Sequence, residues 1–163
     1  VLGDRLVGFT VSMRFPYREK DPIHEPWLTT ISDGWLTRHD PAAEWLYGVE
    51  TCVMTEIHSR GIGGALMHAR FDLVKALNLR GIVGGSGLIS YRANVEQHGM
   101  IAPEDYITRV EAGTLHDTNL TKQIKKGFKP VSVIPNYLRD PNTMGWGALI
   151  VWHNPDYTPT NAV

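Results

Sequence analysis

The sequence has little of three things that would place it in a special class of protein. It holds one cysteine, Cys52, so no disulfide can form within the chain, and we expect a cytoplasmic location. Its charges nearly cancel at a net of −1, which predicts no strong attraction to nucleic acid or to an anionic membrane. No apolar run approaches the roughly 20 residues that a membrane-spanning helix needs. These absences leave an ordinary globular domain.

The length and composition support that class. The chain has 163 residues, of which 42% are hydrophobic and 20% charged, close to the average for globular domains. We therefore expect one domain over residues 1–163. The chain opens at Val1 in a pattern typical of a strand end, a Gly-Asp turn and a new strand. Because domains seldom begin inside a hairpin, we expect an N-terminal segment to be missing.

Apolar periodicity and turn residues predict an alternation of strands and helices. Strands are expected at residues 5–14, 45–54, from 82 onward, 131–134 and 148–152. Helices are expected from residue 60, from Pro103 to about Gly113, and from Asp117 to Lys126. A long irregular stretch, residues 15–43, separates the first two strands. This order predicts an α/β fold with a mixed central sheet flanked by helices.

The helix that begins near residue 60 is the longest predicted element. Its apolar positions are spaced as on one helical face: Ile62, Leu66, Ala69, Leu73, Ala76 and Leu77. Arg80 is expected in its last turn, with Gly81 as its C-terminal stop. The sequence at its start, R-G-I-G-G-A, carries the strongest chemical signal in the chain.

A glycine-rich helix start favours anion binding. The first turn of a helix has unpaired N–H groups, and glycines let a phosphate approach the backbone. Arg60 would add a charged contact. The other reading is a tight turn without a ligand. No Lys-Ser or Lys-Thr follows the glycines, so this is no P-loop, and Leu66 stands where a dinucleotide-binding fingerprint needs its last glycine.

The run from Val53 to Leu66 resembles motif A of the GNAT N-acetyltransferases, in which a strand, a short loop and [RQ]-x-x-G-x-[GA] open a helix. His58 departs from the usual Arg or Gln of the first position. The K-x-G-F of residues 125–128 and the opening strands also resemble the family, over nearly the whole chain. Other segments resemble a bacterial subgroup often fused to a carbon–nitrogen hydrolase. The CoA-binding residues that this resemblance implies are Val53, Met54, Ser59, Arg60, Gly61, Ile62, Gly63, Gly64 and Ala65.

The resemblance implies a fold, an activity and partners. The fold would be the GNAT fold without its N-terminal strand and helices. The activity would be direct transfer of acetyl from acetyl-CoA to an amine of a small molecule or a peptide, with no metal. A backbone N–H near Val53 or Met54 would stabilise the thioester oxygen. A homodimer stays open, and so does a non-catalytic acyl-CoA-binding module.

The catalytic groups are less clear from the sequence. Glu50 is the first candidate for the base because of its place on the central strand, although it could equally be a structural carboxylate. His116 and Asp33 are weaker candidates. Many family members have a tyrosine acid where this chain has Gln123, so Tyr91 is offered as a substitute.

Two further residue groups have both a functional and a structural reading. Cys52 could act as a nucleophile, but a lone cysteine in an apolar strand is usually a small buried residue. The long loop carries Trp27, Trp35, Asp33 and His39, which either shape an acceptor pocket or anchor the loop.

Overall fold

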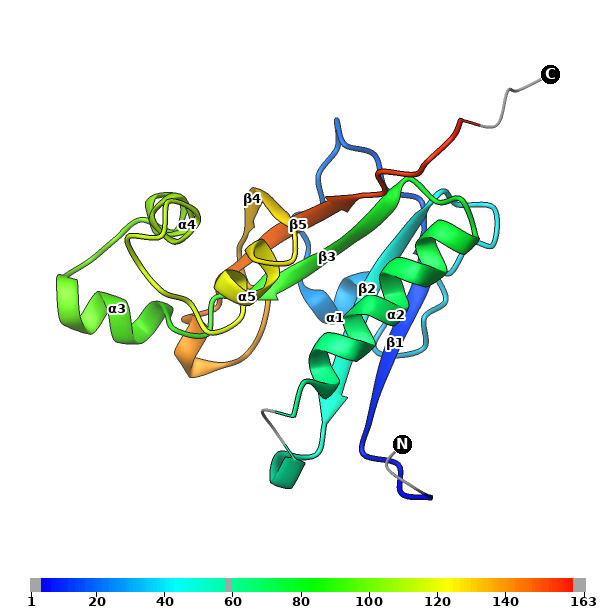
Figure 1. Cartoon of the computed structure of the whole chain (residues 1–163). Coiled ribbons are helices and arrows are strands. Elements are labelled where there is room, and N and C mark those ends of the chain that lie inside the picture. The colour runs from blue at the N-terminus through cyan, green and yellow to red at the C-terminus, as the bar shows by residue number, and fades with distance from the viewer. Residues whose placement is uncertain (1–3, 58–59, 160–163) are drawn as a thin grey trace. The chain divides into compact units, whose positions relative to one another are not determined.

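The computed structural model describes residues 4–57 and 60–159 (Figure 1). Its five strands are hydrogen-bonded in the order β1-β2-β3-β5-β4, which confirms the predicted mixed α/β architecture. The strands are β1 Gly8–Phe15, β2 Trp45–Val53, β3 Gly81–Gly87, β4 Lys129–Ile134 and β5 Gly147–His153. The helices are α1 Trp27–Thr30, α2 Ile62–Ala76, α3 Tyr91–His98, α4 Pro103–Glu111 and α5 Leu120–Ile124, with 3-10 turns η1 Thr55–Ile57 and η2 Pro141–Thr143.

Two compact units make up the chain, and their boundary falls within β3 and β5. The first unit contains residues 4–16, 39–57, 60–82 and 153–159. The second contains residues 17–38 and 83–152. The glycine-rich helix start therefore belongs to the first unit, and the predicted K-x-G-F turn to the second.

The first unit is built on the antiparallel pair β1 and β2, against which α2 packs (Figure 1). Val11 pairs with Glu50, but the next pair is Ser12 with Gly48, so Val49 is an extra residue on β2. This is a β-bulge, which bends the strand and increases its local twist.

The buried face of α2 differs from the predicted one. Arg70, Phe71 and Val74 are its buried residues, whereas Leu73 and Leu77 are 44% and 47% exposed. The apolar residues have helical spacing as predicted, but the side of the second half of the helix that carries Leu73 faces solvent. An arginine occupies a position that a periodicity argument assigns to the polar face.

The predicted end of α2, with Arg80 in the last turn, is wrong. The helix ends at Ala76 in a Schellman motif, in which the Asn78 amide donates to Lys75 O (3.0 Å) and the Leu79 amide to Val74 O (2.9 Å). Asn78 takes the left-handed conformation, with φ 48°, that we predicted for Gly81. Gly81 instead begins β3.

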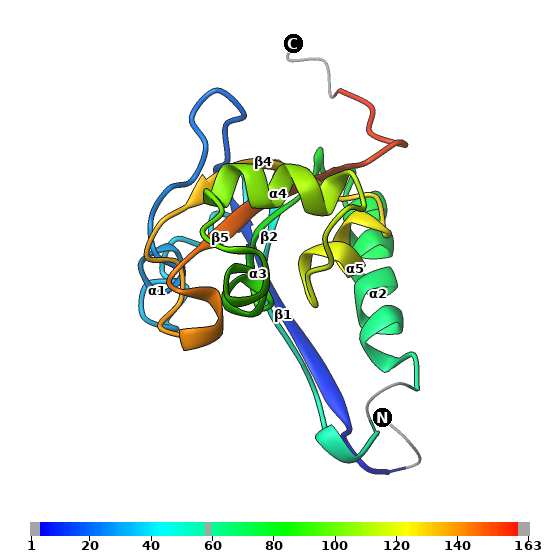
Figure 2. The same cartoon turned by 90° about the vertical axis from the view of Figure 1, so that its left-hand side faces the viewer.

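In the second unit, α4 lies beside β4, and α5 contacts α4 (Figure 2). The prediction for α4 is confirmed: Pro103 occupies the first turn, and Gly113, with φ 74°, follows the end. The α5 region is confirmed in part, because the helix covers Leu120–Ile124 only. Gly127, with φ 92°, reverses the chain so that the Phe128 amide donates to Gln123 O (3.1 Å).

Helix α3 was missed because its sequence shows no apolar face. Of its eight residues only Tyr91 is buried. The helix follows a well-bonded turn rather than an apolar pattern. The turn is held by Asp117, whose fully buried carboxylate accepts from the Ser90 amide (2.9 Å), the Leu120 amide (2.9 Å) and the Tyr106 hydroxyl (2.9 Å).

The glycines of β3 have a packing role. A Cβ atom on Gly85 would collide with the ring of Tyr137, and a Cβ on Gly147 of β5 would lie 2.5 Å from the same ring. Tyr137 is 6% exposed and so lies directly against the backbone of both strands. These glycines admit an aromatic ring and not a phosphate.

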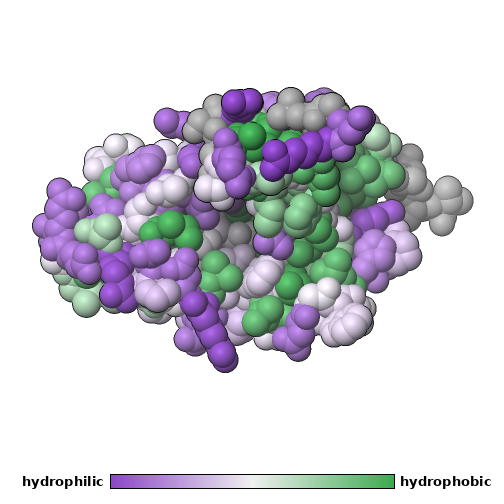
Figure 3. All heavy atoms as spheres, turned by 90° about the horizontal axis from the view of Figure 1, so that it is seen from below, coloured by the Kyte–Doolittle hydropathy of each residue, from purple (hydrophilic) through white to green (hydrophobic). Residues whose placement is uncertain are grey.

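Some large apolar side chains reach the surface in both units, and green areas interrupt the purple surface in Figure 3. The exposed ones are Leu6, Phe9, Leu28, Trp35, Leu73, Leu77, Met100, Val131 and Met144. No helix within the described residues is long and apolar enough to cross a membrane.

Candidate functional site

The turn from β2 into α2 is the predicted anion site, and its backbone is open. Gly61 is the N-cap of α2 with φ 77°, a conformation that favours glycine. No side chain caps the helix, and its first turn contains no acidic residue. The first intrahelical bond is from the Ala65 amide to Gly61 O (2.9 Å), so the preceding amides lack helical partners.

Two of the glycines at this turn have open space where a side chain would stand. A Cβ on Gly61 would meet no atom within 4 Å, and a Cβ on Gly63 would meet only Val53 Cγ2 at 4.0 Å. Arg60 is exposed beside them. This arrangement can hold an anion on backbone N–H groups with a guanidinium nearby. His58 and Ser59, which the sequence analysis also placed here, lie outside the described residues.

Arg70 fixes α2 to the bulge, a feature that sequence reasoning missed. Its Nε donates to Ser12 Oγ (3.0 Å), and its Nη2 donates to the carbonyls of Val11 (2.6 Å) and Glu50 (2.5 Å). The side chain is 6% exposed, and burial lowers the pKa of Arg70 to about 10. The helix that starts at the glycine turn is thus held to the distorted part of the central strand.

Glu50 lies on the sheet face opposite α2. Ser12 and Val53 point towards α2, as shown by the Arg70 bond and the Gly63 contact, and Glu50 has the other parity. The Glu50 carboxylate is exposed and accepts from the Cys52 thiol (3.1 Å). That hydrogen bond and burial raise the pKa of Cys52. A raised thiol pKa disfavours the thiolate and thus the nucleophilic reading of Cys52.

The two backbone donors that were proposed for the thioester oxygen differ in orientation. The Met54 amide donates to Val7 O (2.9 Å), so this amide is already engaged. In an antiparallel pair, amides point alternately to one strand edge and the other. The Val53 amide therefore points to the edge of β2 away from β1.

Tyr91 has a structural partner for its hydroxyl. The side chain is 2% exposed and donates to Ile101 O, and burial raises its pKa. A buried hydroxyl that donates to a backbone carbonyl is poorly placed to protonate a leaving thiolate. The role of Tyr91 as acid stays a prediction that this geometry disfavours. Gln123 is partly buried, and its Oε1 has no hydrogen-bond partner within the described residues.

The long loop between β1 and β2 separates into residues with different roles. Trp27 and Asp33 line a pocket in the second unit, whereas Trp35 is 83% exposed and neither lines that pocket nor anchors the loop. His39 accepts from the Arg14 amide at Nδ1 (3.1 Å). His116 is exposed on the turn before Asp117. Among residues 4–57 and 60–159, no group of three His, Cys, Asp or Glu side chains could hold a metal ion.

The comparison with solved structures decides the fold. The loading GNATL domain of CurA from Lyngbya majuscula superposes with a TM-score of 0.74 over 94% of this chain and 74% of that chain, at 16% identity. The GphF GNAT-like decarboxylase in complex with isobutyryl-CoA gives 0.68 over 91% and 73%, at 18% identity. The chain has the GNAT fold.

Two curated proteins of Bacillus subtilis (strain 168) are similar in sequence to this GNAT-fold chain. The probable hydrolase YhcX is 30% identical over 155 residues, 94% of this chain but 29% of YhcX. The uncharacterized N-acetyltransferase YkwB is 26% identical over 157 residues, 96% of this chain and 68% of YkwB. No protein-family model matches the chain. The GNAT resemblance is thus confirmed in the fold, and fusion to a hydrolase stays a prediction.

Proposed function

We propose that this chain is an acetyl-CoA-dependent N-acetyltransferase that transfers acetyl directly to an amine of a small molecule or a peptide. The observation that carries the proposal is the uncapped, glycine-lined start of α2, the first α-helix after the bulged strand β2. Two likenesses support it. YkwB is named as an N-acetyltransferase, and GphF was solved with an acyl-CoA.

The residues at the α2 start fit the pyrophosphate of CoA. The amides of the first turn would donate to its oxygens, Gly61 and Gly63 leave room for close approach, and Arg60 would add a charged contact. Bound acetyl-CoA would supply the acetyl thioester. The Val53 amide is the proposed donor to the thioester oxygen.

Glu50 is the proposed base. An amine must lose a proton before or during attack, and a carboxylate on the central strand can accept it directly or through one water. The Glu50 carboxylate is exposed on the sheet face opposite α2. The acceptor amine would approach from that face. In this candidate the thiolate departs without an acid, because a thiol with a pKa of about 8.5 is a fair leaving group near neutral pH.

A second candidate is a non-catalytic acyl-CoA-binding module. It is favoured by Gln123, which stands where the resemblance implies a tyrosine acid and which cannot donate a labile proton in that way. Both candidates require acetyl-CoA to bind at the start of α2, but only the first would transfer its acetyl group to an amine.

Calorimetric titration with acetyl-CoA, with ATP as a control, tests the binding step that both candidates share. Binding of acetyl-CoA and not of ATP is expected. Absence of acetyl-CoA binding by the folded chain would overturn both candidates.

Turnover with a panel of amines then separates the candidates. Glu50→Gln should lower the rate by about a hundredfold or more if Glu50 is the base. An unchanged rate would remove Glu50 from the mechanism. Acetyl-CoA binding without turnover on any amine would favour the non-catalytic module.

A further inference from the structure

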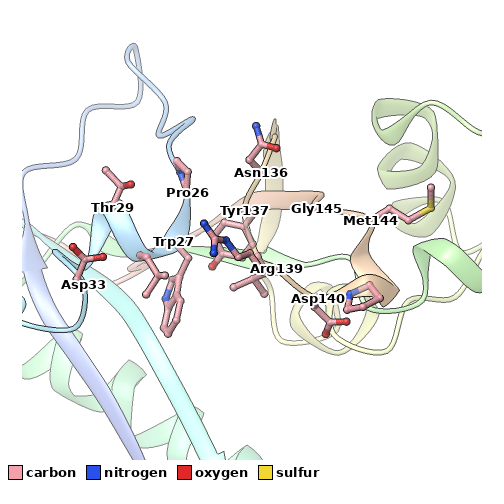
Figure 4. Close-up of a pocket in the computed structure, with 13 residues that line it drawn as sticks. Pro26, Trp27, Thr29, Asp33, Asn136, Tyr137, Arg139, Asp140, Met144 and Gly145 are labelled. Atoms are coloured by element: carbon pink, nitrogen blue, oxygen red, sulfur yellow. The ribbon is translucent and has the colours of Figure 1, made fainter.

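The second unit contains a pocket of about 860 Å³ that the anion site does not use (Figure 4). Its walls come from two segments that are far apart in sequence: α1 with the residues around it, and residues 136–145 between β4 and β5. The volume is in the range of sites for small molecules. Trp27, Leu28, Leu138 and Met144 give it an apolar lining.

The floor of the pocket is rigid. The Trp27 amide donates to Tyr137 O (3.1 Å), which joins the two segments. The Tyr137 ring lies against Gly85 and Gly147, where no side chain could fit. The α1 segment is also tied by the Glu25 carboxylate, which accepts from Arg38 and from the Thr30 hydroxyl. A pocket held in this way is largely formed before a ligand arrives.

The charged side chains of the pocket differ in whether they already have hydrogen-bond partners. Asp140 Oδ1 already accepts the Asn142 amide (2.8 Å) as the N-cap of η2. Arg139 is exposed, and its side chain has no hydrogen-bond or ion-pair partner within the described residues. In Figure 4 Trp27 lies between Asp33 and Arg139. An uncommitted guanidinium beside aromatic and aliphatic side chains suits a carboxylate attached to an apolar group.

We propose that this pocket binds a carboxylate attached to a large apolar group, with the carboxylate on Arg139 and the apolar group against Trp27 and Leu28. The recognition of the carboxylate rests on the pocket alone.

The test is calorimetric titration of the chain, without acetyl-CoA, with three probes of one size. Phenylalanine carries both charged groups, 3-phenylpropanoate carries only the carboxylate, and 2-phenylethylamine carries only the ammonium. Phenylalanine and 3-phenylpropanoate should bind, and 2-phenylethylamine should bind at least tenfold more weakly. Equal or tighter binding of the amine, or no binding of any probe up to millimolar concentration, would overturn the proposal.

Variants locate the binding. Arg139→Gln should weaken 3-phenylpropanoate by roughly tenfold to a hundredfold, the usual effect of losing a charged hydrogen-bonding partner. Arg109→Gln, at an exposed position on α4 outside the pocket, is the matched control and should change nothing. If Arg139→Gln bound 3-phenylpropanoate as tightly as the parent chain, the role of Arg139 in binding the carboxylate would be refuted.

A second variant tests the apolar wall without risk to the fold. Leu28 is 47% exposed, so Leu28→Ala should leave stability nearly unchanged and weaken phenylalanine several-fold, but leave alanine unaffected. An equal effect on both amino acids would contradict the assignment of the side chain to this wall. These titrations contain no acetyl-CoA. If the chain failed to transfer acetyl, the binding of the probes to this pocket would still stand. Acetylation of amines without probe binding would overturn the pocket alone.

Discussion

Gly63→Glu separates the anion site from the stability of α2. Gly63 is exposed, is the second residue of the helix, and has room for a side chain, since a Cβ would meet only Val53 Cγ2 at 4.0 Å. Glutamate exceeds glycine in helix propensity by roughly 0.5 kcal/mol. An acidic residue in the first turn adds about 0.3–1 kcal/mol through the helix dipole. The variant should therefore gain about 1 kcal/mol, or roughly 2–4 °C in Tm.

The same carboxylate should strongly weaken acetyl-CoA binding. At about 5 Å from a pyrophosphate with two charges, and with an effective dielectric constant of about 40, the repulsion is about 3 kcal/mol. That energy corresponds to a loss of affinity of roughly a hundredfold. Thermal unfolding and calorimetric titration with acetyl-CoA measure the two effects in one preparation. The chain should become slightly more stable while it loses its ligand.

Gly63→Gln is the control, because it has the same size without the charge. It should retain most of the affinity and a similar Tm. If Gln weakens binding as much as Glu, the loss is steric and the electrostatic argument fails. If folded Gly63→Glu binds acetyl-CoA like the parent chain, the start of α2 is not the anion site, and the central proposal is refuted.

Three further predictions concern the supporting structure. Arg70→Met leaves two partly buried carbonyls without their donor, so urea unfolding should show a loss of roughly 2–4 kcal/mol; a loss under 0.5 kcal/mol would contradict the role of Arg70 as a fixed contact. Burial and the Asp117 carboxylate raise the pKa of Tyr106, so the folded state keeps this proton when the unfolded state loses it. The free energy of unfolding should therefore be unaffected by this group below pH 10 and fall above about pH 10; Tyr106→Phe should remove that part of the decline, as urea titrations between pH 9 and 11 would show. Glu50→Gln should speed alkylation of Cys52 by iodoacetamide at pH 8, because the carboxylate that raises the thiol pKa is gone; an unchanged rate would mean that the thiol is shielded by packing.

Sequence reasoning predicted the order of the elements and the glycine turn because both depend on local signals. Helix α4 has Pro103 in its first turn and Gly113 after its end, and the structure follows both signs. The α2 end was misplaced because asparagine can also take the left-handed conformation, and Asn78 does so three residues before the glycine that the argument preferred.

The long-range features could not be predicted from one sequence. Arg70 looks like a surface residue on a helix, and only the bulge in β2 creates acceptors for it. Gly85 of β3 is explained by the ring of Tyr137, more than 50 positions away in the chain. A pocket formed by α1 and the β4–β5 connection requires knowledge of which loops meet.

Because of the bulge at Val49, we expect insertions and deletions to be tolerated less well in β2 than in the loop around Trp35. Trp45 and Tyr47 share a sheet face with Glu50 and Cys52, because the extra residue switches the alternation from odd to even positions. Deleting Val49 itself would restore a regular ladder with the same pairs and lose only the bend, whereas deleting another residue of β2 would turn the side chains beyond it to the opposite face. Related sequences should therefore keep a constant spacing from Glu50 to Gly61, while insertions and deletions accumulate in the exposed loop around Trp35.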